Sequence, residues 1–347
     1  MANTIQHKRG TAANWTSANP TLAVGEFGYE TDTGKLKLGD GSTAWSALGY
    51  FEAEEAVAAY SFQGSNYGYV SGGSNSRSSV IDKFSFAADA NATDVGDLVQ
   101  PLYGAAGQSS SESGYTSGGA APGYTDTIQK FPFSADTNAT DVGDLLAVSS
   151  YGAGQSSSEN GYHSGGTPNL RDVIQKFPFA TDANSTNVGT LTGERVPYGA
   201  GQSSSENGYV VDVSNNSIEK FPFAADANAT FVGTITPLGG QAGACQSSNT
   251  HGYTSGLRYD PGSGYVYASN IFKNSFAADA NATDIANLTQ ARIWAAGQSS
   301  VSNGYTSGGL APPYSNVIDK FPFASDTNAT DVGDLTIAAS LVAGQQY

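Results

Sequence analysis

The sequence lacks several features that would assign it to a class directly. It has one cysteine, Cys245, among 347 residues, which excludes an intrachain disulfide framework and a zinc site built from several thiolates. No stretch approaches the roughly 20 apolar residues that span a bilayer. The first ten residues also have no apolar run of the kind found in secretion signals. We therefore expect a soluble protein without membrane insertion.

Charge is scarce as well. Charged residues make up 13% of the chain, about half the usual share. The 15 Lys and Arg are outnumbered by 31 Asp and Glu, which gives a net charge of −16. Binding of nucleic acid or anionic lipid through bulk positive charge is therefore excluded, and any anion site must be local. The chain has instead 19 Tyr, 16 Phe and 43 Gly, with many small polar residues, a composition that favours β structure.

A sequence motif recurs six times after residue 60. Tyr-Thr-Ser-Gly-Gly, Ile-Gln-Lys-Phe-Pro-Phe and Asp-Thr-Asn-Ala-Thr occur in order between residues 115 and 140, and variants follow along the chain. The last phenylalanine of the motif recurs every 44 to 53 residues, at Phe86, Phe133, Phe179, Phe223, Phe276 and Phe323. A period of about 48 residues is close to that of kelch-type propeller blades and longer than most solenoid repeats.

Each repeat predicts four short antiparallel strands. In the third copy we expect strands at residues 153–158, 162–166 and 173–179, and a fourth that ends near Leu191. Asn160-Gly161 is a strong hairpin signal, and four such strands make one propeller blade. The final residues 343–347 repeat the opening of a copy. They therefore predict a closing strand that completes the first blade and removes an exposed edge.

The repeats resemble those of kelch-like propellers over about five sixths of the chain. A double glycine after the second strand and the period carry the resemblance. Phe-Pro-Phe in the third strand replaces the tryptophan that ends a kelch blade, and the fourth copy has Val210-Val211-Asp212 in place of the double glycine. The prediction is an all-β chain in which residues 60–347 form a six-bladed kelch-like β-propeller.

Residues 1–50 lie outside the repeat. Turn signals at Asn19-Pro20, Asp32-Thr33-Gly34 and Asp40-Gly41 predict short strands. Arg9-Gly-Thr, Leu22-Ala-Val-Gly-Glu, the run from Gly28 to Lys35 and Lys37-Leu-Gly-Asp-Gly closely resemble the N-terminal domain of the bacteriophage major tropism determinant, a family found in phage tail fibres. The resemblance implies a β-prism-like module of three intertwined chains, and hence a homotrimer that attaches to other virion proteins. Residues 51–59 are expected to be a linker.

Variation among the repeats predicts which surface binds. In a four-stranded antiparallel blade, the loop between strands 2 and 3 and the connection to the next blade emerge on one face, and the other two turns emerge on the opposite face. The two turns are nearly identical in every copy, whereas the loops of the first face vary in length and content. Loops on a rigid scaffold commonly carry binding, so we predict that the variable face binds a ligand.

Arginine placement supports this prediction. Arg77, Arg171 and Arg258 fall in strand 2–3 loops and Arg195 and Arg292 in blade connections, whereas one lysine recurs in the third strand of every repeat and is predicted to be architectural. Guanidinium groups suit carboxylate, sulfate or phosphate. The longest loop adds Tyr259, Tyr265 and Tyr267, whose rings could stack on sugars. We predict that these eight residues bind an anionic glycan; the alternative is that each loop arginine is only solvated.

Three other patterns receive a structural interpretation. The Asp-x-Asn-x-Thr-Asp run, which starts for example at Asp89 and Asp136, has the oxygen spacing of calcium loops but lacks the glycine and distant glutamate of an EF-hand. An Asx turn is favoured, and no metal or cofactor is predicted. Trp294 aligns with Tyr151 and Tyr198, and packing between blades is predicted for all three. The histidines His163 and His251 do not recur and no catalytic motif is present, so no catalytic residue and no enzymatic activity are predicted.

The predicted function is that of a bacteriophage virion structural protein, a tail fibre or receptor-binding adhesin made in the host cytoplasm. Residues 1–50 would attach it to the particle, and the propeller loops would bind a glycan or protein on the bacterial surface. The first alternative is a head or neck fibre or decoration protein without receptor binding. The second is a tailspike-like enzyme that degrades glycans through unrecognised carboxylates such as Glu194 or Asp260.

Overall fold

The computed structural model of the chain describes residues 7–50, 63–75, 77–194, 200–236 and 240–347. The chain divides into two compact units, Met1–Ala59 and Tyr60–Tyr347. The predicted linker at 51–59 and the predicted site residue Arg195 lie outside the described residues. Among the described residues no helix has the length and apolar character needed to cross a membrane.

The first unit is a three-stranded sheet with one short helix. Strand β2 (Phe27–Glu30) lies between β1 (Lys8–Gly10), which is parallel to it, and β3 (Leu36–Leu38), which is antiparallel. Helix α1 (Ala12–Ala18) begins after Thr11, whose hydroxyl accepts a hydrogen bond from the backbone N–H of Asn14. The turn signals of this segment predict only strands, so this helix is a difference from the prediction.

Three buried side chains form the core of the first unit: Trp15, Leu22 and Trp45. The two indole rings stack with centroids 4.2 Å apart. Lys37 is also buried, and its Nζ donates a hydrogen bond to the carbonyl oxygen of Trp45 at 2.8 Å. The ammonium lies 4.9 Å from the Trp45 ring and 4.4 Å from the Tyr50 ring. Cation–π contacts and one hydrogen bond thus compensate a buried charge in a very small core.

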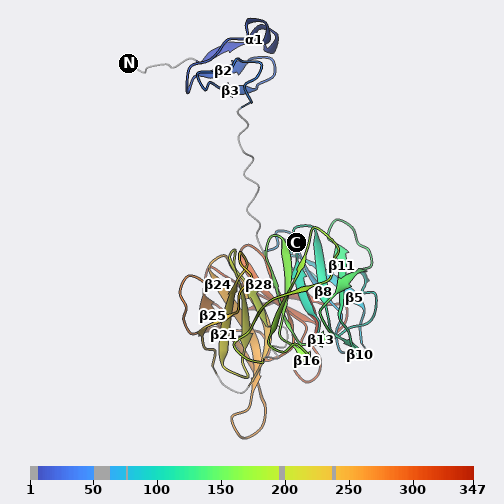
Figure 1. Cartoon of the computed structure of the whole chain (residues 1–347). Coiled ribbons are helices and arrows are strands. Elements are labelled where there is room, and N and C mark those ends of the chain that lie inside the picture. Colours follow the sequence, from blue (N-terminus) through green and yellow to red (C-terminus); the bar gives the residue numbers. More distant parts are fainter. Residues whose placement is uncertain (1–6, 51–62, 76, 195–199, 237–239) are drawn as a thin grey trace. The chain divides into compact units, whose positions relative to one another are not determined.

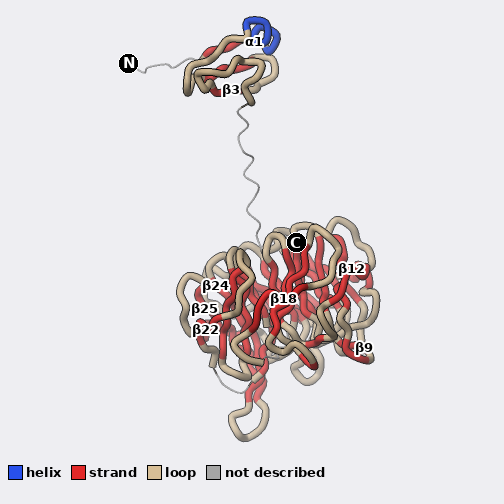
Figure 2. The backbone as a smooth tube through the Cα atoms, viewed as in Figure 1, coloured by secondary structure: helices blue, strands red, loops and turns tan. Residues whose placement is uncertain are grey.

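The described residues of the second unit form six four-stranded antiparallel sheets, which we name blades A to F (Figures 1 and 2). The strands of each blade are given from the inside outward. Blades A and B consist of β31 (Ala343–Gln346), β4 (Tyr67–Ser71), β5 (Val80–Ser85) and β6 (Thr93–Asp97), and of β7 (Ala106–Ser109), β8 (Ser113–Ser117), β11 (Thr127–Pro132) and β12 (Thr140–Asp144). Blades C and D consist of β14 (Ala153–Ser156), β15 (Asn160–Ser164), β17 (Val173–Pro178) and β18 (Thr186–Thr190), and of β19 (Gly201–Ser203), β20 (Asn207–Asp212), β21 (Ser217–Pro222) and β22 (Thr230–Gly233). Blades E and F consist of β23 (Gln241–Ser247), β24 (His251–Tyr259), β25 (Val266–Ser275) and β26 (Thr283–Asn287), and of β27 (Ala296–Ser299), β28 (Asn303–Ser307), β29 (Val317–Pro322) and β30 (Thr330–Asp334). The predicted all-β, six-bladed propeller is confirmed.

Four two-residue strands lie outside the blades, in the loops. β9 (Ala120–Ala121) pairs with β10 (Gly123–Tyr124), and β13 (Ser149–Ser150) pairs with β16 (Thr167–Pro168). The last strand behaves as predicted. β31 pairs antiparallel with β4, with Ala343 opposite Ser71 and Gln346 opposite Gly68, so the C-terminal residues complete blade A.

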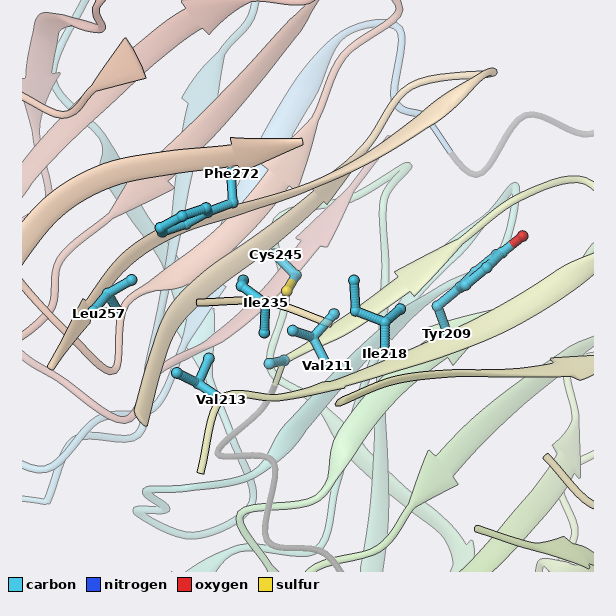
Figure 3. Close-up of a cluster of buried hydrophobic side chains, with 9 residues drawn as sticks. Tyr209, Val211, Val213, Ile218, Ile235, Cys245, Leu257 and Phe272 are labelled. Atoms are coloured by element: carbon cyan, nitrogen blue, oxygen red, sulfur yellow. The ribbon is translucent and has the colours of Figure 1, made fainter. Parts of the chain in front are cut away.

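The innermost strands pack closely, and five of the six have a glycine on the wall of the channel. A Cβ on Gly154 would lie 2.2 Å from the backbone oxygen of Gly107 in the preceding blade, and Gly107, Gly201, Gly297 and Gly344 are equally crowded. Blade E has Cys245 at the corresponding position. Its side chain packs among buried residues that include Val211 and Leu257 (Figure 3). Burial raises the pKa of this thiol to about 12, so it remains protonated and unreactive.

Polar contacts repeat around the ring and hold neighbouring blades together. Each inner-strand glutamine donates through Nε2 to the carbonyl oxygen of the second-strand tyrosine in the next blade; the pairs are Gln108–Tyr162, Gln155–Tyr209, Gln202–Tyr253, Gln246–Tyr305, Gln298–Tyr69 and Gln345–Tyr115. The same tyrosines contact phenylalanines at the end of the third strand of the next blade. The ring centroids of Tyr162 and Phe223, for example, lie 4.9 Å apart. Aromatic stacking and amide hydrogen bonds thus occupy the same junction.

The recurrent lysines are architectural, as predicted. Each pairs with an aspartate of the next blade; the pairs are Lys83–Asp136, Lys130–Asp182, Lys176–Asp226, Lys220–Asp279, Lys273–Asp326 and Lys320–Asp89. The asparagine two residues after each aspartate accepts a backbone N–H from the preceding blade, as Asn138 does from Asp97 at 3.1 Å. The first two oxygens of the calcium-like run therefore join blades. The predicted Asx turn forms at its last position, where Asp94 accepts the N–H of Gly96.

Candidate binding face

The variable face comprises the described parts of the strand 2–3 loops (72–79, 118–126, 165–172, 213–216, 260–265 and 308–316) and of the blade connections (98–105, 145–152, 191–200, 235–240, 288–295 and 335–342). Backbone hydrogen bonds join the two sets. The N–H of Gly73 in the blade A loop donates to Leu102, and Tyr103 and Ala120 form a bridge on the blade B side. The connection 98–105 is thus held between the loops of blades A and B.

The axial channel opens in a small cavity of about 60 Å³ on this face. Tyr151, Trp294 and Leu341 line it together with glycine and alanine residues of the inner strands. These three residues have positive φ angles between 55° and 61°. The backbone N–H of Leu341 donates to Trp294, and that of Tyr151 donates to Gly104. These backbone bonds join successive connections. The predicted side-chain packing of Trp294 and Tyr151 between blades stays a prediction, and Tyr198 lies outside the described residues.

A hairpin between β24 and β25 projects from the variable face (Figure 1). Arg258 on this hairpin stands opposite Tyr267, and its guanidinium carbon lies 4.0 Å from the centroid of the Tyr265 ring and 5.4 Å from that of Trp294. Its Nη2 also donates to Oε1 of Gln241 at 2.6 Å. Two aromatic rings and one amide therefore hold a cation in a fixed position beside the channel mouth. Tyr265 itself is 63% exposed.

The other predicted residues that the structure describes do not join this cluster. Arg77 is exposed, and Arg171 forms an ion pair with Glu194 at 3.2 Å, in which both side chains are largely exposed. Arg77, Arg171 and Arg258 belong to blades A, C and E, so other blades separate them around the ring. Tyr259 packs against the buried cluster of blades D and E. The structure thus brings together Arg258, Tyr265 and Tyr267, and Arg77, Arg171 and Tyr259 lie apart from them; Arg195 is outside the described residues.

Arg292 is not a surface residue, and its predicted role as a ligand contact is wrong. Its side chain is fully buried and pairs with buried Asp319 at 2.9 Å. It also donates to the carbonyl oxygens of Thr306 and Val317. Burial lowers the pKa of Arg292 to about 10, which leaves the guanidinium charged at neutral pH. Asp319 accepts further hydrogen bonds from the N–H and hydroxyl of Thr289, so the pair lies in a network that stabilises the blade E–F junction.

Sequence reasoning missed two aromatic residues on this face. Tyr124 in the blade B loop is 46% exposed and Tyr314 in the blade F loop is 40% exposed. The signal was present in the sequence, because both follow Ala-Pro-Gly or Ala-Pro-Pro at the same position of the loop. With Tyr265, they give the described part of the face three exposed phenol rings. Such rings offer flat apolar surface and a hydroxyl, which suits pyranose sugars.

The described residues contain no group of three or more His, Cys, Asp or Glu side chains placed to hold a metal ion. Asp82 has a raised pKa because it is buried below the face, where it accepts hydrogen bonds from Thr336. His163 is buried between two serine hydroxyls, and burial lowers its pKa to about 4. Both groups are enclosed by the blades. The chemistry that the described face offers is therefore binding through rings, one fixed cation and loop amides.

Comparison with known protein families identifies the first unit. Residues 5–43 match the family described as the major tropism determinant N-terminal domain. Two curated relatives are 46% identical to this chain over 46 residues, and both carry the name hyaluronoglucosaminidase. They come from Streptococcus pyogenes phage H4489A and Streptococcus pyogenes phage H10403. The match covers 13% of this chain and 12% and 14% of the respective relatives, so the chain spans about an eighth of their length.

The solved structure of YjhT has the fold of the second unit. It superposes with a TM-score of 0.57 over 78% of this chain and 99% of its own, at 12% sequence identity. At this identity the likeness concerns the fold alone. The major tropism determinant match and the propeller match thus concern different parts of the chain.

Proposed function

We propose that this chain is a structural protein of a bacteriophage virion, a tail fibre or adhesin. Residues 1–50 attach it to the particle, and the variable face of its propeller binds the host surface. The observation that carries the proposal is the match of residues 5–43 to the major tropism determinant N-terminal domain. Relatives of this segment occur in two proteins of Streptococcus phages. A short segment shared with longer phage proteins is what a common attachment module would produce.

The geometry of the propeller supports the second half of the proposal. Gln63 and Gly64, its first described residues, contact Ser300 in a strand 1–2 turn, and Tyr347 contacts Tyr67 beside them. The propeller therefore begins and ends on the turn face. The exposed tyrosines of the variable face and the fixed guanidinium of Arg258 suit a surface glycan, and an acidic sugar would pair with that cation.

We also propose that the chain is a homotrimer through its first unit. The core of this unit consists of three buried apolar side chains, whereas Val24 is 81% exposed and Tyr29 is 38% exposed. So small a module rarely has a sufficient core by itself and commonly gains one by assembly. Native mass measurement of the full chain should give three times the chain mass, and a monomer at micromolar concentration would contradict the proposal.

Location on the particle is the decisive test of attachment. A gold-labelled antibody raised against residues 63–347 should mark the tail or its fibres on intact particles. Label on the head or neck would instead support a fibre or decoration protein without a receptor. Absence of label from every particle would overturn the virion assignment.

Host binding is tested by particles that carry Arg258→Ala together with Tyr265→Ala. These particles should assemble normally and adsorb to host cells at least about 10-fold more slowly, since a charge-assisted contact and a stacked ring are lost. Val301→Ser is the matched control, because Val301 is 63% exposed but lies in a strand 1–2 turn on the opposite face. Equal adsorption of all three particles would exclude this cluster as the contact.

We propose binding without cleavage. The relatives named hyaluronoglucosaminidase match this chain only in the first unit, over 46 residues. That match therefore supports a shared attachment module and carries no catalytic residue into the propeller. Incubation of the full chain with purified host polysaccharide should release no reducing ends. Steady release, abolished by Glu194→Gln or Asp260→Asn, would establish the glycan-degrading alternative.

A further inference from the structure

Two loops of the variable face are copies of each other, although the remaining loops differ from blade to blade. The blade B loop reads Gly-Gly-Ala-Ala-Pro-Gly-Tyr-Thr over residues 118–125, and the blade F loop reads Gly-Gly-Leu-Ala-Pro-Pro-Tyr-Ser over residues 308–315. The corresponding loops of blades A, C, D and E have no tyrosine after an Ala-Pro pair. Blades B and F flank blade A in the ring.

The two loops share most of their backbone hydrogen bonds. In blade B, Thr125 N–H donates to Gly119 O, and Tyr103 and Ala120 exchange backbone hydrogen bonds. In blade F, Ser315 N–H donates to Gly309 O, and Ile293 and Leu310 exchange the same bonds. The φ angles agree as well, at 65° and 106° for Gly118 and Gly119 against 68° and 108° for Gly308 and Gly309. The loops differ in one peptide bond, because the bond between Pro312 and Pro313 is cis. Tyr124 nevertheless pairs with Ala120 as Tyr314 pairs with Leu310, so both tyrosines stand at the same register position of their loops.

Each tyrosine has the same polar neighbours. Beside Tyr124, Nε2 of Gln100 reaches the hydroxyl of Thr125 at 3.5 Å. Beside Tyr314, Nε2 of Gln290 reaches the hydroxyl of Ser315 at 2.5 Å. The glutamines come from the preceding blade connections and are half-buried. The next loop residue is Asp126 in blade B and Asn316 in blade F. The elements that the two places share are therefore a ring, an amide and a hydroxyl, all uncharged.

Architecture does not account for these tyrosines. The loop backbone bonds are made by main-chain groups, and both phenol rings remain 40% or more exposed. The hydrogen bonds that join a blade connection to the third strand of the next blade also form where the strand 2–3 loop has other side chains, as in blade A. A repeated exposed ring on a face that otherwise varies points to a repeated ligand unit.

We propose that Tyr124 and Tyr314 mark two equivalent subsites, each for one uncharged sugar residue, and that the ligand is a polysaccharide whose repeating unit occupies both. The ring would stack on the apolar face of the sugar, and the glutamine amide would bind its hydroxyls. This inference rests on the proposed function and deepens it. Two linked contacts raise avidity through effective concentration, without any new kind of contact.

The test is a binding stoichiometry measured on the full chain. The probes are surface polysaccharide purified from the bacterium to which the particles adsorb and the single-repeat oligosaccharide prepared from it. Titration calorimetry should give two oligosaccharides per wild-type chain, one for Tyr124→Ala or Tyr314→Ala, and none at these subsites for the double variant. Each single variant should also lose at least about 10-fold in affinity for the long polysaccharide. Tyr124→Phe should retain binding, because it keeps the ring.

Some results of this titration would contradict the two subsites alone, and one would contradict glycan binding as a whole. One oligosaccharide per wild-type chain, or loss of binding with only one of the two tyrosines, would overturn the inference. Full binding by the double variant and its loss in Arg258→Ala would also overturn it, while leaving glycan adhesion intact. Failure of the wild-type chain to bind any host polysaccharide would remove both. Unchanged thermal unfolding of the variants, expected for exposed residues, verifies that they are folded.

Discussion

At the residue scale, His163 shows how a repeat tolerates one exceptional side chain. The sister positions in blades B, E and F are Thr116, Thr254 and Thr306. His163 is fully buried, and Ser117 and Ser149 hydroxyls lie 3.0 and 3.1 Å from its ring nitrogens. The site therefore favours the neutral imidazole.

Acid should unfold the propeller partly through this histidine. Burial lowers its folded pKa to about 4, against 6.5 for the free group. The unfolded chain therefore binds a proton more readily, and stability that is complete above pH 6.5 is lost as pH falls towards 4. We expect His163→Thr to remove up to about 3 kcal/mol of this loss. Urea unfolding at pH 7.5 and pH 4.5 measures it. His251→Asn, which alters a half-exposed imidazole, serves as the control, and equal profiles for wild type and His163→Thr would contradict the argument.

The buried pair of Arg292 and Asp319 makes a second prediction at this scale. Arg292→Leu leaves the Asp319 carboxylate buried without its cation and should cost about 3–5 kcal/mol. Adding Asp319→Gln should recover most of that loss, because it recreates the combination of Leu102 and Gln129 at the blade A–B junction. Denaturant unfolding of the single and double variants gives the coupling. A double variant no more stable than the single one would refute this interpretation.

At the element scale, glycine on the inner strands sets how close the blades can come. Gly154→Ala would place a Cβ 2.2 Å from the Gly107 backbone oxygen, and the displaced strand should cost at least about 1–3 kcal/mol. Gly123→Ala is the matched control, because nothing lies within 4 Å of its added Cβ. Thermal unfolding should separate the two clearly. A Gly154→Ala protein with an unchanged melting temperature would show that the blades can separate freely.

The elements also show what the sequence can and cannot predict. Strand formers, turn residues and a period of about 48 residues predict the blades, because every copy repeats the same pattern of strand and turn residues. Helix α1 has seven residues and buries only Trp15, so it leaves no apolar periodicity to detect. An arginine in a loop predicts exposure, and only comparison with Asp319 and Thr289 distinguishes buried Arg292. Tyr124 and Tyr314 were missed because recurrence in two copies resembles neither a full repeat nor a unique loop.

At the scale of the whole molecule, the ring depends on its last strand. β31 buries Ala343 and Gln345, and Nε2 of Gln345 donates to the Tyr115 carbonyl of blade B at 3.0 Å. Backbone pairing of β31 with β4 also covers an edge that would otherwise be unpaired. The closing strand therefore joins the two ends of the six-blade ring and links blade A to blade B.

Deletion of residues 343–347 should open the propeller. The truncated chain loses the inner strand of blade A, so we expect the melting temperature to fall by on the order of 10 °C and the exposed β4 edge to promote aggregation. A synthetic peptide of residues 341–347 should restore the transition by adding the missing strand in trans. The same peptide with Gly344→Ala should fail, because its Cβ would lie 2.3 Å from the Gly297 backbone oxygen. Cooperative unfolding of the truncated chain at the wild-type temperature would mean that five and three-quarter blades suffice, and that closure serves another purpose than stability.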